Sequence, residues 1–139
     1  YPKDVNLYQA QKALDNAPYA VRDGGTIILV AECREGCGNR IFEQWMTEAS
    51  STEQVLQRIQ QRFVLGGHKA AAIARVAQRA RIMLVSPALA GLRLVGLEHW
   101  ASAQAALDAA LAATGPAART IVLPQGSSTL PLARPPAEP

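Results

Sequence analysis

The stretch TIILVA at residues 26–31 decides the fold. It is an almost continuous run of apolar and β-branched side chains, the pattern of a strand that is covered on both faces, as in a parallel sheet. A polar, glycine-containing segment, ECREGCG, follows at once at residues 32–38. In open α/β sheets ligands usually bind beyond the carboxyl ends of the strands, so we expect this loop to line a site.

Helical and strand patterns alternate on both sides of this stretch. Helices are predicted from about residue 7 to 17, 39 to 48, 52 to 63, 67 to 80 and 102 to 113, and further strands at residues 80–85, 92–95 and 120–123. Asn6 with Gln9, and Ser51 with Gln54, have the spacing of capping boxes at two of the helix starts. The alternation predicts an α/β domain of three layers, in which helices flank a mainly parallel central sheet.

Size and composition indicate one globular domain. The chain has 139 residues, of which 49% are hydrophobic and 18% charged, which is enough to build a single core. We expect the domain to span residues 1–133 and the Pro-rich end, residues 134–139, to be a flexible tail. Because the chain begins at the threshold of a helix and without Met, we expect it to be part of a longer protein.

Charge and hydropathy argue against two classes of partner, nucleic acids and membranes. The net charge is only +3 and the basic residues are scattered, so the sequence gives no support for nucleic-acid binding. No apolar run approaches the ~18 residues that a membrane span needs.

The two cysteines, Cys33 and Cys37, are separated by three residues. This spacing is typical neither of a zinc half-site nor of a disulfide framework, so we expect a reducing, cytoplasmic location.

Two polar side chains stand out on the first predicted helix. Gln9 and Lys12 are three residues apart and share a face that points away from the apolar stripe. An amide and a cation placed together in this way suit a carboxylate. By its residue type alone, Lys12 would more often be a solvated surface lysine.

The segment GGHKA at residues 66–70 opens another predicted helix. A helix start presents unpaired N–H groups and a partial positive charge, and glycines let an anion approach them closely. One interpretation is therefore a stand-alone module that binds small anions or has a regulatory role. In the simpler alternative, the glycines only turn the chain.

Four motifs occur along the chain: YPxDxNLYQAxKA at residues 1–13, AECREGxGxxxF at 31–42, GGHKA at 66–70 and PxGxxTLP at 124–131. Together they resemble the C-terminal domain of the nickel-pincer-dependent lactate racemase family. The resemblance implies a racemase or epimerase of 2-hydroxy acids in which Gln9 and Lys12 hold the substrate. It also implies that the nickel-pincer nucleotide and the acid/base histidines belong to an N-terminal domain outside this chain, so this chain alone should be inactive.

His68, within the GGHKA motif, differs from the residue of the lactate racemase itself. It stands approximately where the lactate racemase itself carries an aromatic residue near the substrate. A histidine can hydrogen-bond to a hydroxyl or a second carboxylate, which an apolar ring cannot do. We therefore expect His68, with Lys69 beside it, to contact a substrate whose identity the resemblance does not fix.

The chemistry available to the chain agrees with a role in binding. Moving hydrogen to and from the chiral carbon of a 2-hydroxy acid by a hydride route requires a cofactor and an acid/base pair. The sequence contains only two histidines, His68 and His99, and nothing in the pattern places them on opposite sides of a substrate. A third interpretation, a pure interaction domain, would make Gln9 and Lys12 replaceable without loss of any ligand.

Overall fold

The computed structural model describes residues 1–115 and 117–132, so the predicted domain end at 133 and the predicted tail at 134–139 lie outside the described residues. The α-helices are α1 (Leu7–Asn16), α2 (Arg40–Glu48), α3 (Thr52–Gln61), α4 (Gly67–Ala77) and α5 (Ala103–Thr114). The strands are β1 (Thr26–Val30), β2 (Arg81–Val85) and β3 (Glu98–His99), and short 3-10 turns form η1 (Ala17–Tyr19), η2 (Pro87–Leu89) and η3 (Gly126–Ser128). None of the helices within the described ranges is long and apolar enough to cross a membrane.

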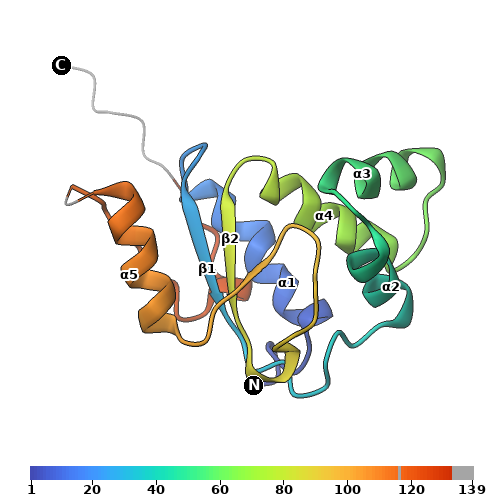
Figure 1. Cartoon of the computed structure of the whole chain (residues 1–139), viewed down its shortest axis with the longest axis horizontal. Helices are drawn as coiled ribbons and strands as arrows, with labels where there is room; N and C mark the ends of the chain where they lie inside the picture. The colour runs from blue at the N-terminus through green and yellow to red at the C-terminus, as the bar shows by residue number, and fades with distance from the viewer. Residues whose placement is uncertain (116, 133–139) are drawn as a thin grey trace.

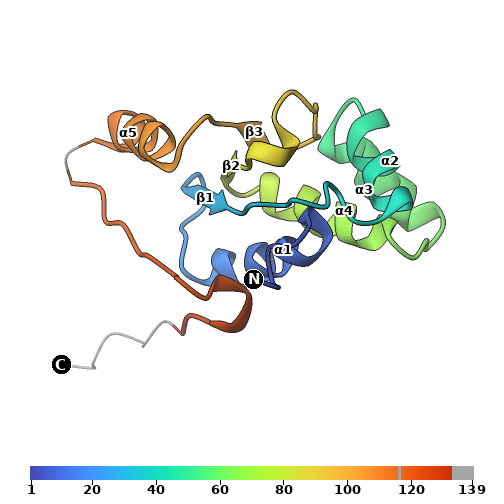
Figure 2. The same cartoon turned by 90° about the horizontal axis from the view of Figure 1, so that it is seen from below.

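The three strands form one parallel sheet in the order β1-β2-β3. Helix α5 covers one face of the sheet, while α1 and α4 cover the other, and α2 and α3 lie beyond α4 (Figures 1 and 2). The predicted three-layer α/β architecture with a parallel sheet is therefore confirmed.

Side chains along the strands point alternately toward the two helix layers. Side chains that face α1 and α4 join the larger core, among them Ile27, Leu29, Ile82 and Leu84. Met83 and Val85 point the other way and pack on Ala106 and Ala110 of α5. The cover over β1 is uneven, since Val30 remains 59% exposed. The uninterrupted apolar run thus predicts the parallel strand correctly but overstates how evenly its two faces are buried.

Residues 92–95, predicted as a strand, form a loop instead. Leu94 and Val95 are buried, and the Val95 N–H donates to the Met46 carbonyl at the end of α2 (2.8 Å). Arg93 adds a hydrogen bond to the Ala49 carbonyl (3.0 Å). The apolar side chains are therefore buried against the end of a helix, where they need no sheet partner. The third strand is the shorter β3.

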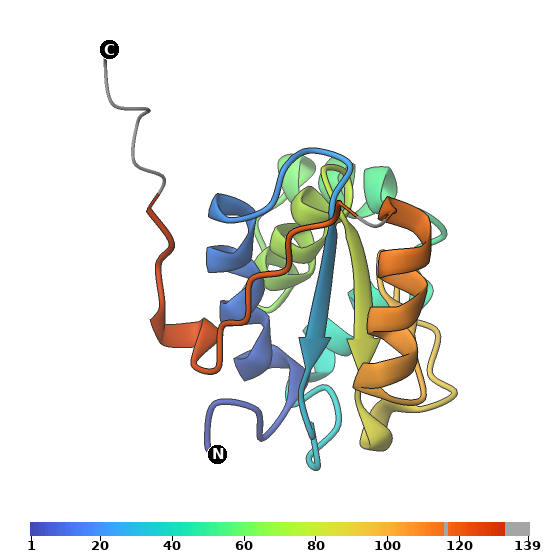
Figure 3. The ribbon, with the colours of Figure 1, turned by 90° about the vertical axis from the view of Figure 1, so that its left-hand side faces the viewer.

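Residues 120–123, predicted as the last strand, are also not in the sheet. Ile121 and Val122 are 63% and 77% exposed, so these β-branched side chains lack the packed surface on which strand preference depends. Figure 3 shows the chain running from α5 past β1 to η3. There the Asn16 side chain donates to the Gly126 carbonyl (2.9 Å) and fixes η3 against α1.

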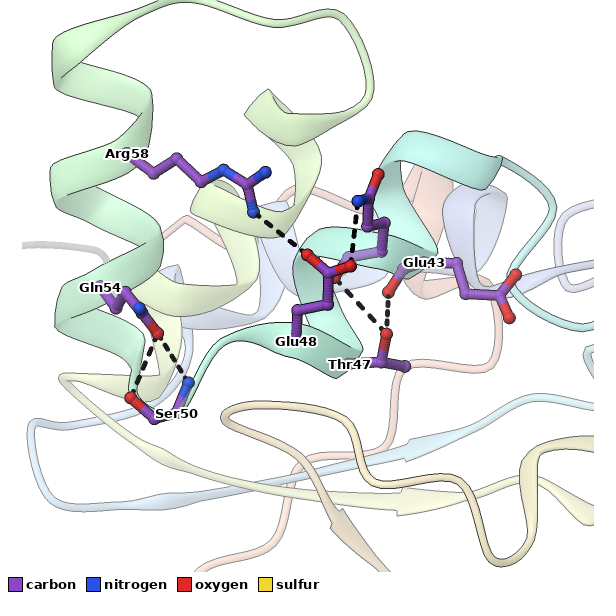
Figure 4. A network of polar contacts seen from close by, with 7 residues as sticks. Glu43, Thr47, Glu48, Ser50, Gln54 and Arg58 are labelled. Atoms are coloured by element: carbon purple, nitrogen blue, oxygen red, sulfur yellow. Dashed lines mark hydrogen bonds and ion pairs between the residues drawn. The ribbon is translucent and has the colours of Figure 1, made fainter.

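A surface network joins α2 to α3 (Figure 4). Glu48 accepts a hydrogen bond from Gln44 (2.9 Å) and forms an ion pair with Arg58 of α3 (3.8 Å). At the start of α3, Ser51 caps the helix as predicted, because its hydroxyl accepts from the Gln54 N–H (3.3 Å). The return bond of the predicted capping box is displaced by one residue, since the Gln54 side chain accepts from the N–H of Ser50 (2.7 Å) and not from that of Ser51. Exposed contacts of this kind contribute up to about 1 kcal/mol each.

Candidate functional site

Gln9 and Lys12 meet on the surface of α1. Lys12 Nζ donates to Gln9 Oε1 at 2.9 Å, and the lysine is exposed. Asn6 caps the helix as predicted, because its side chain accepts from the Gln9 N–H at 3.0 Å. The second half of the predicted capping box does not form, since the Gln9 side chain holds Lys12 instead. The structure thus brings together the two residues that the sequence predicts as a pair.

The loop at residues 32–38 fixes the start of α1. The N–H groups of Leu7 and Tyr8 donate to the carbonyls of Gly36 (3.0 Å) and Cys37 (3.2 Å). These donors would otherwise be unsatisfied at a helix N-terminus, so the loop acts as a cap made of backbone. The loop that follows β1 therefore orients the helix that carries Gln9 and Lys12.

Close packing holds this loop against the helix cap. Gly38 has φ +78° and lies against the side chain of Asn6, where a Cβ atom would overlap the amide. The Glu32 and Glu35 side chains of the same loop are exposed.

The start of α4 uses its two glycines for packing. Gly66 has φ +96°, and a Cβ atom on Gly67 would lie 2.8 Å from the Trp45 indole. The N–H groups of His68 and Lys69 already donate to the carbonyls of Val64 (3.2 Å) and Gly66 (3.1 Å). An anion bound at this helix start would therefore find no free donor at these two residues.

His68 is fixed by contacts on three sides. Its Nδ1 accepts from the Gly66 N–H at 3.1 Å. Its ring stacks on Phe63 with centroids 5.7 Å apart, and the Tyr8 ring meets it edge-on at 6.5 Å. Because Nδ1 is an acceptor here, the neutral ring carries its proton on Nε2. His68 therefore offers a hydrogen-bond donor through Nε2.

Lys69 reaches from α4 to α1. Its Nζ donates to Gln11 Oε1 at 2.7 Å and lies 5.1 Å from the centre of the Tyr8 ring. Partial burial lowers the pKa of Lys69, and the nearby charge of Lys12 lowers it further, while Asp15 acts in the opposite direction. In the described part of the chain, neither lysine takes part in an ion pair. Two ammonium groups thus lie near each other without a carboxylate partner in contact.

The sequence interpretation missed two residues that organise this cluster. Tyr8 touches Lys69 and His68, and it also packs edge-on against Phe42 with centroids 5.6 Å apart. Gln11 is fully buried within the α1 stripe that was predicted to be apolar. Helical spacing places Tyr8 on the face of Lys12 and Gln11 on the face of Leu7, but it does not show that both residues meet Lys69 of α4.

The two cysteines are not suited to binding a metal. Cys33 and Cys37 are free and buried. Burial raises the pKa of the Cys33 thiol, and it raises the pKa of the Cys37 thiol to about 11. Both thiols therefore stay protonated near neutral pH, whereas a metal ligand is a thiolate. Across the described ranges, no three His, Cys, Asp or Glu residues gather where they could hold a metal ion.

Two concave surfaces of the described chain lie away from these residues. A shallow depression between α2 and α3 is lined by residues that include Trp45, Arg58 and Arg62, and none of the four predicted site residues contributes to it. The Gln9, Lys12, His68 and Lys69 cluster lies on α1 and at the start of α4, where Lys12 is exposed and the other three residues are partly exposed. Such a surface can bind part of a ligand and needs a second wall to enclose it.

Known proteins resemble the chain in sequence and in structure. The model of the lactate racemase C-terminal domain family matches residues 1–130. Lactate racemase of Lactiplantibacillus plantarum is 29% identical over 133 residues, covering 91% of this chain, and that of Thermoanaerobacterium thermosaccharolyticum is 39% identical over 59 residues, or 42% of the chain. The solved lactate racemase apoprotein from T. thermosaccharolyticum superposes with a TM-score of 0.81 at 25% identity over 94% of the chain.

The match covers only part of each relative. The aligned region spans 31% of the L. plantarum protein, 14% of the T. thermosaccharolyticum protein and 33% of the solved chain. The resemblance expected from the four sequence motifs is confirmed by the family match over residues 1–130 and by the shared fold. This chain belongs to the lactate racemase C-terminal domain family.

Proposed function

We propose that the chain is the C-terminal domain, residues 1–133 with a tail at 134–139, of a larger racemase or epimerase of 2-hydroxy acids. In this proposal Gln9 and Lys12 bind the substrate carboxylate at an active site shared with an N-terminal domain. The observation that carries it is the Lys12–Gln9 contact of 2.9 Å on a helix start that the loop at 32–38 holds in place. Family membership supports the reaction class.

The orientation of the Gln9 amide suits this role. Lysine can only donate, so the atom that it contacts at 2.9 Å is the amide oxygen. The Gln9 NH₂ group is then left to donate to a substrate oxygen, while Lys12 binds the carboxylate through a charge-assisted hydrogen bond, roughly twice as strong as a neutral one. The pair would fix both the charge and the direction of the substrate.

His68 and Lys69 complete the proposed set of substrate contacts. His68 Nε2 and Lys69 Nζ both donate, and both residues touch the Tyr8 ring that lies beside α1. They would meet the part of the substrate beyond its carboxylate. All four residues bind and orient, and we assign no catalytic residue to this chain.

The cofactor of the family is the nickel-pincer nucleotide, which would accept the hydrogen of the chiral carbon as a hydride. The described residues gather no set of His, Cys, Asp or Glu that could hold a nickel ion. On the family resemblance we assign the cofactor to the N-terminal domain and derive no step through residues of this chain. The isolated chain would be inactive, and the two free thiols support a reducing, cytoplasmic location.

The test uses the full-length protein loaded with the cofactor and a panel of single-enantiomer 2-hydroxy acids, with the products separated by chiral chromatography. We expect interconversion of at least one acid, and Lys12→Met should lower kcat/KM roughly 10- to 100-fold, the value of one charged hydrogen bond. Lys3→Met, which removes an exposed lysine outside the cluster, is the matched control. Equal activity of parent and Lys12→Met would overturn the assigned site, and no interconversion of any acid would overturn the reaction class.

A further inference from the structure

The cluster on α1 and α4 offers donors and positive charge. Lys12 and Lys69 present ammonium groups, and His68 presents its Nε2 proton. A single carboxylate bound at Lys12 would satisfy one of the two ammonium groups and leave the other. The arrangement has the capacity for a second anionic group.

Lys69 is held in place by a built contact. Gln11, which is fully buried, accepts from Lys69 Nζ at 2.7 Å through Oε1 and donates to Asp15 through Nε2 at 2.5 Å. Both ends of the amide are used, so it cannot rotate without breaking one bond. The Tyr8 ring lies 5.1 Å away from the ammonium group. Lys69 is thus positioned, whereas a solvated lysine would be free to move.

The electrostatics leave this ammonium group without full compensation. Asp15 is the acidic group that faces it, but Asp15 bonds to Gln11 and forms no ion pair with Lys69 among the described residues. Burial and the charge of Lys12 both lower the pKa of Lys69, which means that both disfavour its charged form. An anion bound between the lysines would offset both effects and add to the partial compensation that Asp15 provides.

We propose that Lys69 forms a second anion position beside Lys12, and that the substrates are 2-hydroxy acids bearing a second anionic group, as in 2-hydroxydicarboxylates. This inference rests on the proposed function and deepens it. The first carboxylate binds Lys12 and Gln9, and the second binds Lys69 with His68 Nε2 as an additional donor. An apolar 2-substituent would cover the Lys69 ammonium group without giving it an anionic partner, so the site should disfavour substrates of that kind.

The experiment compares two ligands that differ only in charge. Malate and its 4-amide have nearly the same shape, but the amide lacks the second negative charge. The full-length, cofactor-loaded parent should convert malate with a kcat/KM at least about 10-fold above that of the amide. Lys69→Met should lower kcat/KM for malate roughly 10- to 100-fold and that for the amide by a smaller factor, about 2- to 10-fold, because the amide loses only a neutral hydrogen bond. Arg75→Met, which removes an exposed charge from the same helix, should leave both values unchanged.

Two further variants distinguish the loss of the second anion position from a folding defect. Lys69→Arg keeps the charge and should retain the preference for malate, while Lys12→Met should lower turnover of both ligands. Equal turnover of malate and the amide by the parent, or an equal effect of Lys69→Met on both, would overturn the second anion position. Lys12-dependent turnover of monocarboxylates alone would also overturn it and leave the proposed function intact. No turnover of any 2-hydroxy acid would overturn both.

Discussion

Lys69 Nζ on α4 lies 2.7 Å from Oε1 of Gln11 on α1, and Gln11 is fully buried. This bond joins the two helices that carry all four proposed substrate contacts. The distance between the anion positions at Lys12 and Lys69 is therefore set by how α1 packs on α4. A change in that packing would alter the site without touching any residue that meets the substrate.

Replacing Gln11 tests this link. Gln11→Met should lower the free energy of unfolding of the full-length protein by about 1–3 kcal/mol, because it leaves Lys69 and Asp15 without their buried partner. Gln57→Met on α3 is the matched control, since Gln57 is exposed and should be replaceable within about 0.5 kcal/mol. Denaturant unfolding measures both variants, and equal losses would show that the buried amide is not a special link.

The Cys37 thiol should make stability depend on pH in the alkaline range. Its pKa is raised from 9.0 to about 11 in the folded chain, so the unfolded state loses this proton first as the pH rises. The contribution of the protonated Cys37 thiol to the free energy of unfolding is fully present below pH 9. It is lost between about pH 9 and 11, and the total loss is near 3 kcal/mol. The difference in unfolding free energy between the parent and Cys37→Ala should shrink over this window. A difference that is constant with pH would contradict the assigned shift.

The contact between Gly67 and Trp45 should be intolerant of a methyl group. A Cβ atom on Gly67 would lie 2.8 Å from the indole ring, so Gly67→Ala should cost roughly 1–3 kcal/mol. Trp45→Phe makes room, and a double-mutant cycle measured by thermal unfolding should give a cost for Gly67→Ala that is smaller in the Trp45→Phe background. Strictly additive losses would indicate that the glycine is needed for another reason.

The cap at Asn6 should influence both stability and substrate affinity. Asn6→Ala removes the acceptor of the Gln9 N–H and should cost about 1 kcal/mol, whereas Asn6→Asp keeps an acceptor and should cost less. Because the first turn of α1 carries Gln9, we expect Asn6→Ala to raise KM more than it lowers kcat. Steady-state kinetics of the full-length enzyme separate the two constants, and an effect confined to kcat would argue against a role of the cap in substrate binding.

The sequence predicts the strong local patterns correctly. The apolar run at residues 26–31 forms β1, the Ile82–Val85 run lies in β2, and Gln9 and Lys12 meet because helical spacing places them on one face. Each of these predictions depends on residues that are neighbours in the chain, where backbone geometry alone decides which side chains can meet.

Predictions that depended on tertiary contacts were less successful. Residues 92–95 and 120–123 have strand-forming composition, but the first segment packs against the end of α2 and the second is exposed. Gln11 is buried because Lys69, 58 positions away, satisfies its amide, and helical spacing cannot reveal such a partner. The role of Tyr8 was missed for the same reason, since its ring gains importance only when α4 brings Lys69 beside it.

The most direct test of the account is a crystal structure of the full-length protein, loaded with the cofactor and bound to 2-hydroxy-2-methylbutanedioate, which carries both carboxylates of the proposed substrates. This acid keeps the carboxylate and the hydroxyl but has no hydrogen on the carbon that reacts, so it should remain unchanged in the site. We expect a carboxylate oxygen at about 3 Å from Lys12 Nζ and an oxygen of the ligand at about 3 Å from the Gln9 amide nitrogen. A carboxylate bound only by groups outside this chain, with Lys12 pointing into solvent, would contradict the account.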